Sequence, residues 1–478
     1  MTKPLIALAA LSLAVSAAGA RTPARVLPPP PLTIEDVADI ALTEDERAWD
    51  FVEGITTEVG SRQAGTEAEA RGRAWAVAWL KAHGFQNVAD EPFMMPTWVP
   101  GEPGRAEIVS PFPQSLAVAP LGDSGSTGPE GITAEVVMFK SVAELVAAPD
   151  GSLKGKIAFV SNTMTRTQDG SQYGFAGPTR WVASGIAASK GALATVIKSV
   201  GTDDHRNPHT GGTSFPAGVK PTPAGALSNP DAANLERMFK RAAGKPITMR
   251  LVLTPKDLGQ TESGNVVGEI VGRNPYLPPV LLACHLDSWW NGTGAVDDGA
   301  GCGIIAAAAM NVAKTGAPLR TIRVLFAGAE ETGLWGSKAY SAAHIAEPIA
   351  VGLESDFGAD RIWRFDSNFR ESNPALHRRI AAAVARFGVS SGSDVASGGA
   401  DLNIVRDQKG ALIDLQQDGT RYFDLHHTPD DTLDKIDPVQ LRQNVAVWTQ
   451  VVGILASEET SILTGGPVPS APPMMKGK

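Results

Sequence analysis

Short apolar runs of strand length alternate with longer segments of helical periodicity between residues 247 and 457. This alternation predicts an α/β fold: a mostly parallel, mixed central sheet with helices on both faces. Ligands of such a sheet bind beyond the carboxyl ends of its strands, so the residues that follow each strand are the candidate site. We predict strands at 265–271, 279–285, 321–327, 349–356 and 411–415, and helices at 299–314, 336–343, 373–387 and 438–457.

The strand at 279–285 ends in a His-x-Asp motif formed by His285 and Asp287. Residues two apart in a strand point to the same face, so Asp287 is placed to accept a hydrogen bond from the His285 ring nitrogen that does not bind metal. Such a carboxylate orients a metal-binding histidine. A single histidine is more often structural, but its place at a strand end makes His285 a candidate metal ligand.

A glycine-rich loop with two adjacent acids, Asp297 and Asp298, precedes the helix at 299–314. An acid at a helix start caps the first turn, and this structural role suits Asp298. Asp297 is then free to face the cleft. A glycine-rich loop before a helix also suits phosphate, but two acids would repel it.

Acids also follow the next two strands. Glu330 and Glu331 come after the strand at 321–327, and Asp356 closes the strand at 349–356. Burying two glutamates is costly unless they bind something. One could ligate a metal while the other takes a proton from water, although a solvated loop would also explain the pair.

A short loop carries two adjacent histidines, His426 and His427, among several aspartates. The spacing of the residues does not decide which of these two histidines would bind a metal. Nitrogen and oxygen ligands of this kind suit zinc. The chain has two cysteines, Cys284 and Cys302, which could form one bridge; the sequence favours two small buried side chains instead.

The segments "HLDSW…GAVDDGAG", "FAGAEETGLWGS", "ESDFG" and "HHTPDDT" resemble the co-catalytic zinc aminopeptidases and their carboxypeptidase Q relatives. The resemblance runs from about residue 45 to 455 and is closest to the carboxypeptidase Q branch. It implies the zinc exopeptidase fold, two Zn²⁺ ions per chain, a peptide substrate and a possible homodimer. It also implies a cis peptide bond between Asp297 and Asp298.

The resemblance assigns a role to each candidate. Asp297 would bridge both ions, with His285 and Asp356 on one and Glu331 and His427 on the other. Glu330 would be the general base, Asp287 would orient His285, and His426 would have no metal role. Candidates for the substrate wall are Trp289, Trp290, Phe357, Tyr422 and His426.

The start of the chain has the pattern of an export signal. Lys3 precedes the apolar run Leu5–Val15, and Ala18-Gly19-Ala20 suits cleavage. We therefore expect a periplasmic or secreted protein that leaves the membrane after cleavage. The expected divisions are a signal peptide (1–20), a Pro-rich linker (21–32), a catalytic domain in two parts (33–115 and 246–459) around an inserted protease-associated-like domain (116–245), and a flexible tail (460–478).

Composition limits the alternatives. The chain has 478 residues, and its hydrophobic fraction of 43% is typical of a globular protein. Its net charge of −9 argues against a nucleic-acid-binding surface. The resemblance leaves open a non-catalytic receptor and a glutaminyl-cyclase-like acyltransferase, both known on related folds. It also leaves open whether an exopeptidase would act at the amino or the carboxyl end. His205 and His209 could reach the cleft from the inserted part or lie on its surface.

Overall fold

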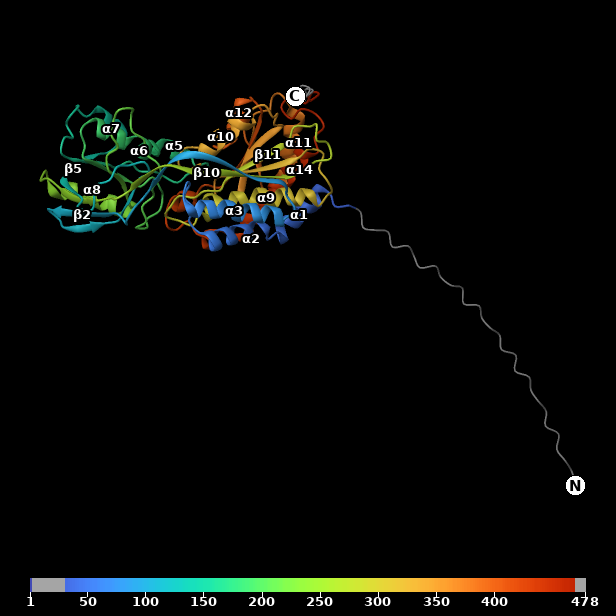
Figure 1. Ribbon diagram of the computed structural model, residues 1–478, viewed down its shortest axis with the longest axis horizontal. Helices are drawn as coiled ribbons and strands as arrows, with labels where there is room; N and C mark the ends of the chain where they lie inside the picture. Colours follow the sequence, from blue (N-terminus) through green and yellow to red (C-terminus); the bar gives the residue numbers. More distant parts are fainter. Residues whose placement is uncertain (2–30, 469–478) are drawn as a thin grey trace.

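The computed structural model describes Met1 and residues 31–468, which form two lobes, each built on an eight-stranded sheet (Figure 1). The expected cleavage site, most of the linker and the end of the tail lie outside the described residues, so export stays a prediction. Among the described helices, none has the length and apolar character needed to cross a membrane.

The first sheet has the strand order β1-β10-β12-β11-β13-β16-β14-β15. Its four central strands are parallel, whereas β10 and β14 join them antiparallel. This confirms the predicted mixed α/β sheet. The strands are β1 (Gln86–Val99), β10 (Lys256–Ile270), β11 (Val280–His285), β12 (Ile322–Ala327), β13 (Val351–Glu354), β14 (Ile362–Ser367), β15 (Ser390–Ser391) and β16 (Ala411–Gln417).

Both faces of the central strands are buried beneath helices. Leu282 and Cys284 of β11 pack into the core cluster that includes α9 and α14, whereas Leu281 and Ala283 join the cluster that includes Tyr340 of α10. This two-sided burial explains why the strand is a continuous apolar run. The helices of this lobe are α1 (Ile34–Glu44), α2 (Arg47–Gly54), α3 (Glu67–Ala82), α9 (Ala300–Ala313), α10 (Trp335–His344), α11 (Pro374–Val384), α12 (Asn403–Asp407), α13 (Tyr422–Leu425) and α14 (Pro438–Ala456).

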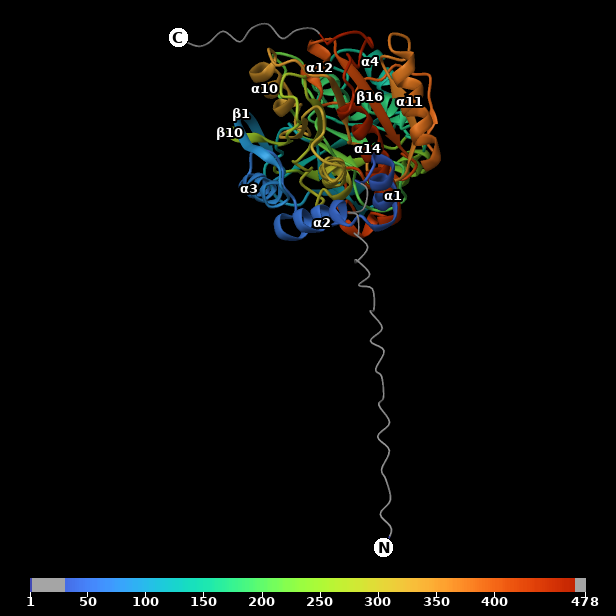
Figure 2. The same ribbon diagram turned by 90° about the vertical axis from the view of Figure 1, so that its right-hand side faces the viewer.

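The helix boundaries follow from capping side chains. Thr33 and Asp36 form a capping box at the start of α1. Asp437 caps α14, whose first residue is Pro438. In Figure 2, α1, α2 and α3 lie together on one side of the first lobe, and α10 and α12 lie on the other.

The second lobe spans residues 105–252, and its sheet has the order β3-β2-β9-β5-β6-β7-β8-β4. The predicted limits of the inserted part, 116 and 245, therefore both fall inside this sheet, because β2 and β9 pair with each other. The strands are β2 (Arg105–Ser110), β3 (Gln114–Leu116), β4 (Val118–Pro120), β5 (Ile132–Phe139), β6 (Ile157–Val160), β7 (Ala194–Lys198), β8 (Ala224–Leu227) and β9 (Thr248–Val252). The helices are α4 (Val142–Ala147), α5 (Ser171–Ala176), α6 (Pro178–Trp181), α7 (Ala183–Ser189) and α8 (Asn229–Ala242).

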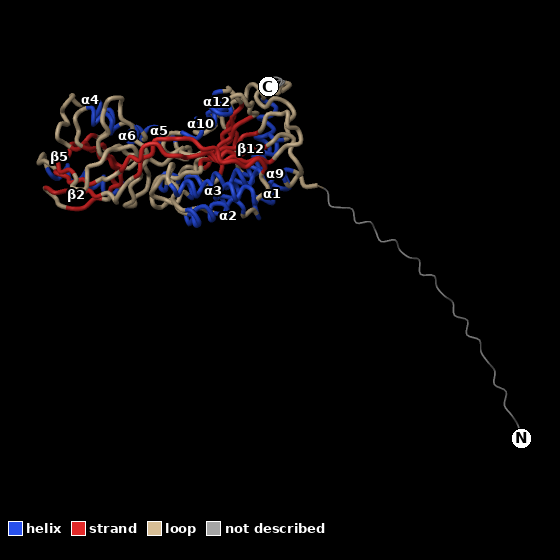
Figure 3. The backbone as a smooth tube through the Cα atoms, viewed as in Figure 1, coloured by secondary structure: helices blue, strands red, loops and turns tan. Residues whose placement is uncertain are grey.

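Two long antiparallel strands connect the lobes. β1 leads from the first sheet to β2, and β10 returns from β9 (Figure 3). The second lobe is thus an insertion between two paired strands. Their many ladder hydrogen bonds give it a firm attachment.

One expectation was wrong in detail. Cys284 and Cys302 were expected to be free, but they form a disulfide with a Cα–Cα distance of 5.3 Å. The end of β11 packs against the first turn of α9, and this contact brings the two sulfurs together.

Leu282→Ala tests the central strand. Leu282 is fully buried in the cluster under α9. Its truncation should lower the free energy of unfolding by about 2–5 kcal/mol in urea titrations, because it leaves a cavity. Leu258→Ala is the control, since Leu258 is 49% exposed. Equal stability of the two variants would contradict this packing.

Candidate metal centre

The register of the parallel strands brings the candidate ligands to one edge of the sheet. Ala283 of β11 pairs with Glu354 of β13, so His285 and Asp356, two residues further along, emerge at the same level. His285 also pairs with Ala327, the last residue of β12. Glu330 and Glu331 follow that strand closely, and the histidine loop follows β16.

Asp297 lies between two groups of side chains. His285 Nε2 is 3.0 Å from Asp297 Oδ1 and 3.5 Å from Asp356 Oδ1. On the other side, His427 Nε2 is 2.6 Å from Glu331 Oε2 and 3.6 Å from Asp297 Oδ2. Each carboxylate oxygen of Asp297 therefore faces one of two neighbouring sites that combine nitrogen and oxygen donors.

The electrostatics of the cluster favour bound cations. Asp297 Oδ2 and Glu331 Oε1 are buried without a hydrogen-bond partner among the described residues, which is rare unless something else binds them. Burial opposes protonation of His285, yet the carboxylates of Asp356, Asp287 and Asp297 raise its pKa well above the ordinary value. The cluster thus attracts positive charge, and its hard oxygen and imidazole donors fit zinc.

The surroundings of the two adjacent histidines favour the neutral imidazole. Burial, with the charge of Arg180 nearby, lowers the pKa of His427 to about 3. Burial and the neighbouring His427 likewise lower the pKa of His426 well below its ordinary value. A neutral imidazole is the form that binds metal. The rings stack 3.7 Å apart, and His426 Nε2 is 3.7 Å from Asp297 Oδ2, so both histidines approach the second group.

Asp287 does not orient His285 in the expected way. His285 Nδ1 is 3.0 Å from the main-chain carbonyl of Asp287, whereas the carboxylate Oδ1 is 3.7 Å away. That Oδ1 instead accepts a hydrogen bond from the Glu330 amide at 3.1 Å. The expectation assumed a continuing strand, but β11 ends at His285, so the Asp287 side chain turns toward the loop after β12. It positions the backbone of Glu330.

The start of α9 agrees with expectation. The Asp297–Asp298 peptide bond is cis, as the resemblance implies. Asp298 accepts hydrogen bonds from the amides of Gly301 and His285, at 3.1 and 3.2 Å, so it serves as a structural acid in the first turn. Asp431 accepts from the amides of Val296 and Asp297 and fixes this turn from the histidine loop.

Sequence reasoning missed Arg62, which is fully buried beneath the site. Its guanidinium donates to the carbonyls of Leu286, Thr293 and Gly294. These carbonyls belong to the loop between His285 and Asp297. One side chain thus holds the loop that places both candidate ligands, His285 and Asp297. No local pattern marks Arg62, because these three carbonyls lie more than 200 positions away in the chain.

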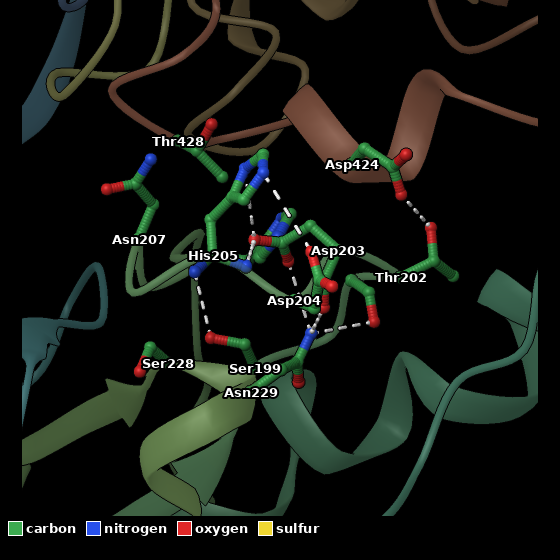
Figure 4. Close-up of polar contacts among 12 residues, drawn as sticks. Ser199, Thr202, Asp203, Asp204, His205, Asn207, Ser228, Asn229, Asp424 and Thr428 are labelled. Atoms are coloured by element: carbon green, nitrogen blue, oxygen red, sulfur yellow. Dashed lines mark hydrogen bonds and ion pairs between the residues drawn. The ribbon is translucent and has the colours of Figure 1, made fainter.

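The second lobe holds the histidine loop in place. His427 Nδ1 is 3.1 Å from the Thr210 carbonyl, and His209 Nδ1 is 2.8 Å from the His426 carbonyl. Thr202 donates to Asp424 at 2.7 Å (Figure 4). The Thr210 carbonyl fixes the ring of His427 with Nε2 toward Asp297, as carbonyl partners do for metal-binding histidines.

A cavity of about 540 Å³ opens over the cluster between the lobes. Its lining includes Asp297, Glu330, Glu331, Asp356 and His427, together with the wall candidates Trp289, Phe357, Tyr422 and His426. Trp290, another wall candidate, is absent from the lining. His209 is buried, whereas the His205 side chain is 61% exposed, and neither lines the cavity. Missed lining residues include Tyr173, Arg180 and Trp181 of the second lobe.

Burial also changes the Glu330 carboxyl. Burial, together with the like charges of Asp356 and Asp401, raises its pKa well above the ordinary value, although His285 opposes the shift. Bound cations would lower this pKa again. The side chain faces the cavity beside Asp356, where a proton could pass to or from a ligand.

Comparison with known proteins identifies relatives of the chain. The sequence model of peptidase family M28 matches residues 265–452 of the chain. Carboxypeptidase Q of Bos taurus is 31% identical, and the match covers 86% of each chain; the Homo sapiens protein is 30% identical with the same coverage. Among solved structures, a peptidase M28 precursor from Shewanella amazonensis is 40% identical and has a TM-score of 0.85, with 91% of this chain and 98% of that one covered. A zinc aminopeptidase from Bacillus subtilis shares the fold at 18% identity, with a TM-score of 0.61 and coverage of 88% and 97%.

Arg62→Met should destabilise the protein by several kcal/mol in urea titrations. It leaves the carbonyl oxygens of Leu286 and Thr293 without a donor among the described residues and removes one of the two donors to the Gly294 carbonyl, which also accepts from the Gly299 amide. Each unsatisfied buried acceptor costs about 1–3 kcal/mol. Arg71→Met serves as the matched control, because Arg71 is exposed. A wild-type unfolding midpoint for Arg62→Met would show that the loop does not depend on this side chain.

Proposed function

We propose that this chain, which belongs to peptidase family M28, is a two-zinc exopeptidase that acts on dipeptides or short peptides. The observation that carries this proposal is the position of Asp297, whose two oxygens face separate groups of histidine and carboxylate donors. Two-metal peptidase sites are built around such shared ligands. The named relatives, carboxypeptidase Q and a zinc aminopeptidase, support the same chemistry.

In this proposal, His285, Asp356 and Asp297 would hold one zinc ion, and Glu331, His427 and Asp297 would hold the other. When bound, the ions supply Lewis-acid activation of water and of the peptide carbonyl. His427, rather than His426, is assigned as a ligand because its Nε2 lies 2.6 Å from Glu331 Oε2 and its Nδ1 is held by Thr210. His426 remains in the cavity wall, where it can contact substrate.

Glu330 acts as the general base. Its carboxyl takes the proton of the attacking water and returns it to the leaving amine. Asp287 supports this exchange from behind, because it holds the Glu330 amide at 3.1 Å and so fixes where the carboxyl can reach.

The shape of the cavity suits short peptides. The second lobe, which we assign as a protease-associated domain, covers the strand ends and encloses the volume of about 540 Å³. Trp289, Phe357 and Tyr422 give the wall an aromatic surface for side chains of the substrate. We propose export to the periplasm or the extracellular space, and a homodimer, on the resemblance and the amino-terminal pattern alone.

A receptor or a glutaminyl-cyclase-like acyltransferase would fit the site less well. A receptor has no need for Glu330 in the cavity beside a complete set of donors. A glutaminyl-cyclase-like enzyme would use one zinc ion, whereas Asp297 faces two groups of donors in this structure. Hydrolysis by two ions therefore accounts for more of the geometry.

Metal analysis tests the two-ion proposal. Purified protein should carry about two zinc equivalents by mass spectrometry, as expected of a two-metal site. Chelation should abolish peptidase activity, and added zinc should restore it. Full activity in a metal-free preparation would contradict the mechanism, and a single tightly bound ion would contradict the bridging role of Asp297.

Glu330→Gln should retain zinc but lose activity by about 10²–10⁴-fold in kcat, the contribution expected of a proton shuttle. The amide keeps the shape of the side chain and removes its ability to accept the proton. Glu371→Gln is the control, because Glu371 is exposed and outside the cavity lining. Undiminished turnover by zinc-loaded Glu330→Gln would remove Glu330 from this role.

A further inference from the structure

Arg180 brings a buried positive charge from the second lobe into the cavity wall. It lies on α6 and is 7% exposed. No carboxylate among the described residues lies within ion-pair distance of its guanidinium. A buried cation without an anionic partner is costly, so the site is built for a partner that the chain does not supply.

The donors of the guanidinium are largely unused. Nη1 donates to the Thr210 carbonyl at 3.1 Å, and Nε is buried without an acceptor among the described residues. His427 Nδ1 is 3.3 Å from Arg180 Nη1, but this imidazole nitrogen also faces the Thr210 carbonyl at 3.1 Å. When His427 Nε2 faces the carboxylates, Nδ1 carries the proton and donates to Thr210, so it does not accept from Arg180. An arginine has five N–H donors, so most remain available to a ligand.

The surroundings hold the guanidinium in place. Its Cζ lies 5.4 Å from the ring centre of Tyr173 and 5.9 Å from that of Trp181. The backbone at Gly211 also approaches it: a Cβ there would lie 2.5 Å from Cζ, so only glycine allows the contact. Aromatic rings and close backbone fix the plane of the guanidinium without neutralising it.

We propose that Arg180 binds the terminal carboxylate of the peptide substrate. This inference rests on the proposed exopeptidase function and chooses the carboxyl end. A guanidinium matches a carboxylate with two parallel hydrogen bonds, and burial strengthens the pair. Arg180 touches the far side of His427, so a carboxylate held there lies next to the metal cluster. One residue spans about 3.8 Å, so the scissile carbonyl of a dipeptide and its carboxylate can occupy neighbouring positions.

The proposal gives the second lobe a role in specificity. The first lobe supplies the proposed zinc ligands and Glu330, whereas Arg180 comes from an insertion between β1 and β10. Peptides with a free terminal carboxyl group should be preferred. Peptides that extend more than one residue beyond the scissile bond on its carboxyl side should be poor substrates.

The test compares a dipeptide with its carboxyl amide, both with a free amino group, by chromatography of the products. Wild-type protein loaded with zinc should favour the free acid in kcat/KM by about 10- to 100-fold, the contribution of hydrogen bonds to a charged group. Arg180→Gln should bring this ratio close to one, mainly by slowing hydrolysis of the acid. Arg180→Lys should give an intermediate ratio, because it keeps the charge without the paired donors.

Arg206→Gln is the matched control: it removes an arginine of the same lobe whose side chain is 61% exposed and paired with Asp231. Its ratio should equal that of the wild type. Zinc content is measured for every variant. If Arg180→Gln does not retain zinc, the role of Arg180 is judged from the ratio of the wild type and the ratio of zinc-loaded Arg180→Lys.

A wild-type ratio near one, or an unchanged ratio in zinc-loaded Arg180→Gln, overturns the role of Arg180 while leaving the exopeptidase function intact. No hydrolysis of either substrate by zinc-loaded wild-type protein would instead overturn the proposed function, and the inference with it.

Discussion

The mutual repulsion of buried carboxylates at the carboxyl ends of β11, β12 and β13 is the constraint on which this structure depends. Asp297, Glu331 and Asp356 share one cleft, with Glu330 and Asp287 close by. Such a group is costly to bury without cations. These carboxylates lie at the edge of the sheet where the parallel strands, the first turn of α9 and the histidine loop meet. Metal binding and folding should therefore be coupled in this protein.

The supporting contacts show how the cluster is held. Arg62 gathers three carbonyls of the loop between His285 and Asp297, and Asp431 fixes the amide of Asp297 from the histidine loop. Thr210 of the second lobe turns His427 toward the cluster. Two side chains and one main-chain carbonyl, from three parts of the chain, thus define one geometry. The second lobe is part of the candidate site, since it orients the proposed ligand His427 and contributes to the cavity wall.

Much of the fold and the candidate ligands could be predicted from the sequence, because both leave local patterns. Apolar runs marked β11, β12 and β13, and acids or histidine at their ends marked the site. Arg62, Thr210 and Arg180 escaped prediction, because their roles arise from contacts between distant segments. The error over Asp287 had the same origin: strand geometry was extended beyond the last residue of β11, where the chain turns. The disulfide between Cys284 and Cys302 also depends on tertiary packing.

The central claim is that Asp297 joins two zinc sites of defined composition. Anomalous diffraction from crystals of the zinc-loaded protein, recorded on both sides of the zinc absorption edge, tests it most directly. The account predicts two peaks that flank Asp297, one beside His285 and Asp356, the other beside Glu331 and His427. A single peak, or a second ion bound by His426 in place of His427, would contradict it.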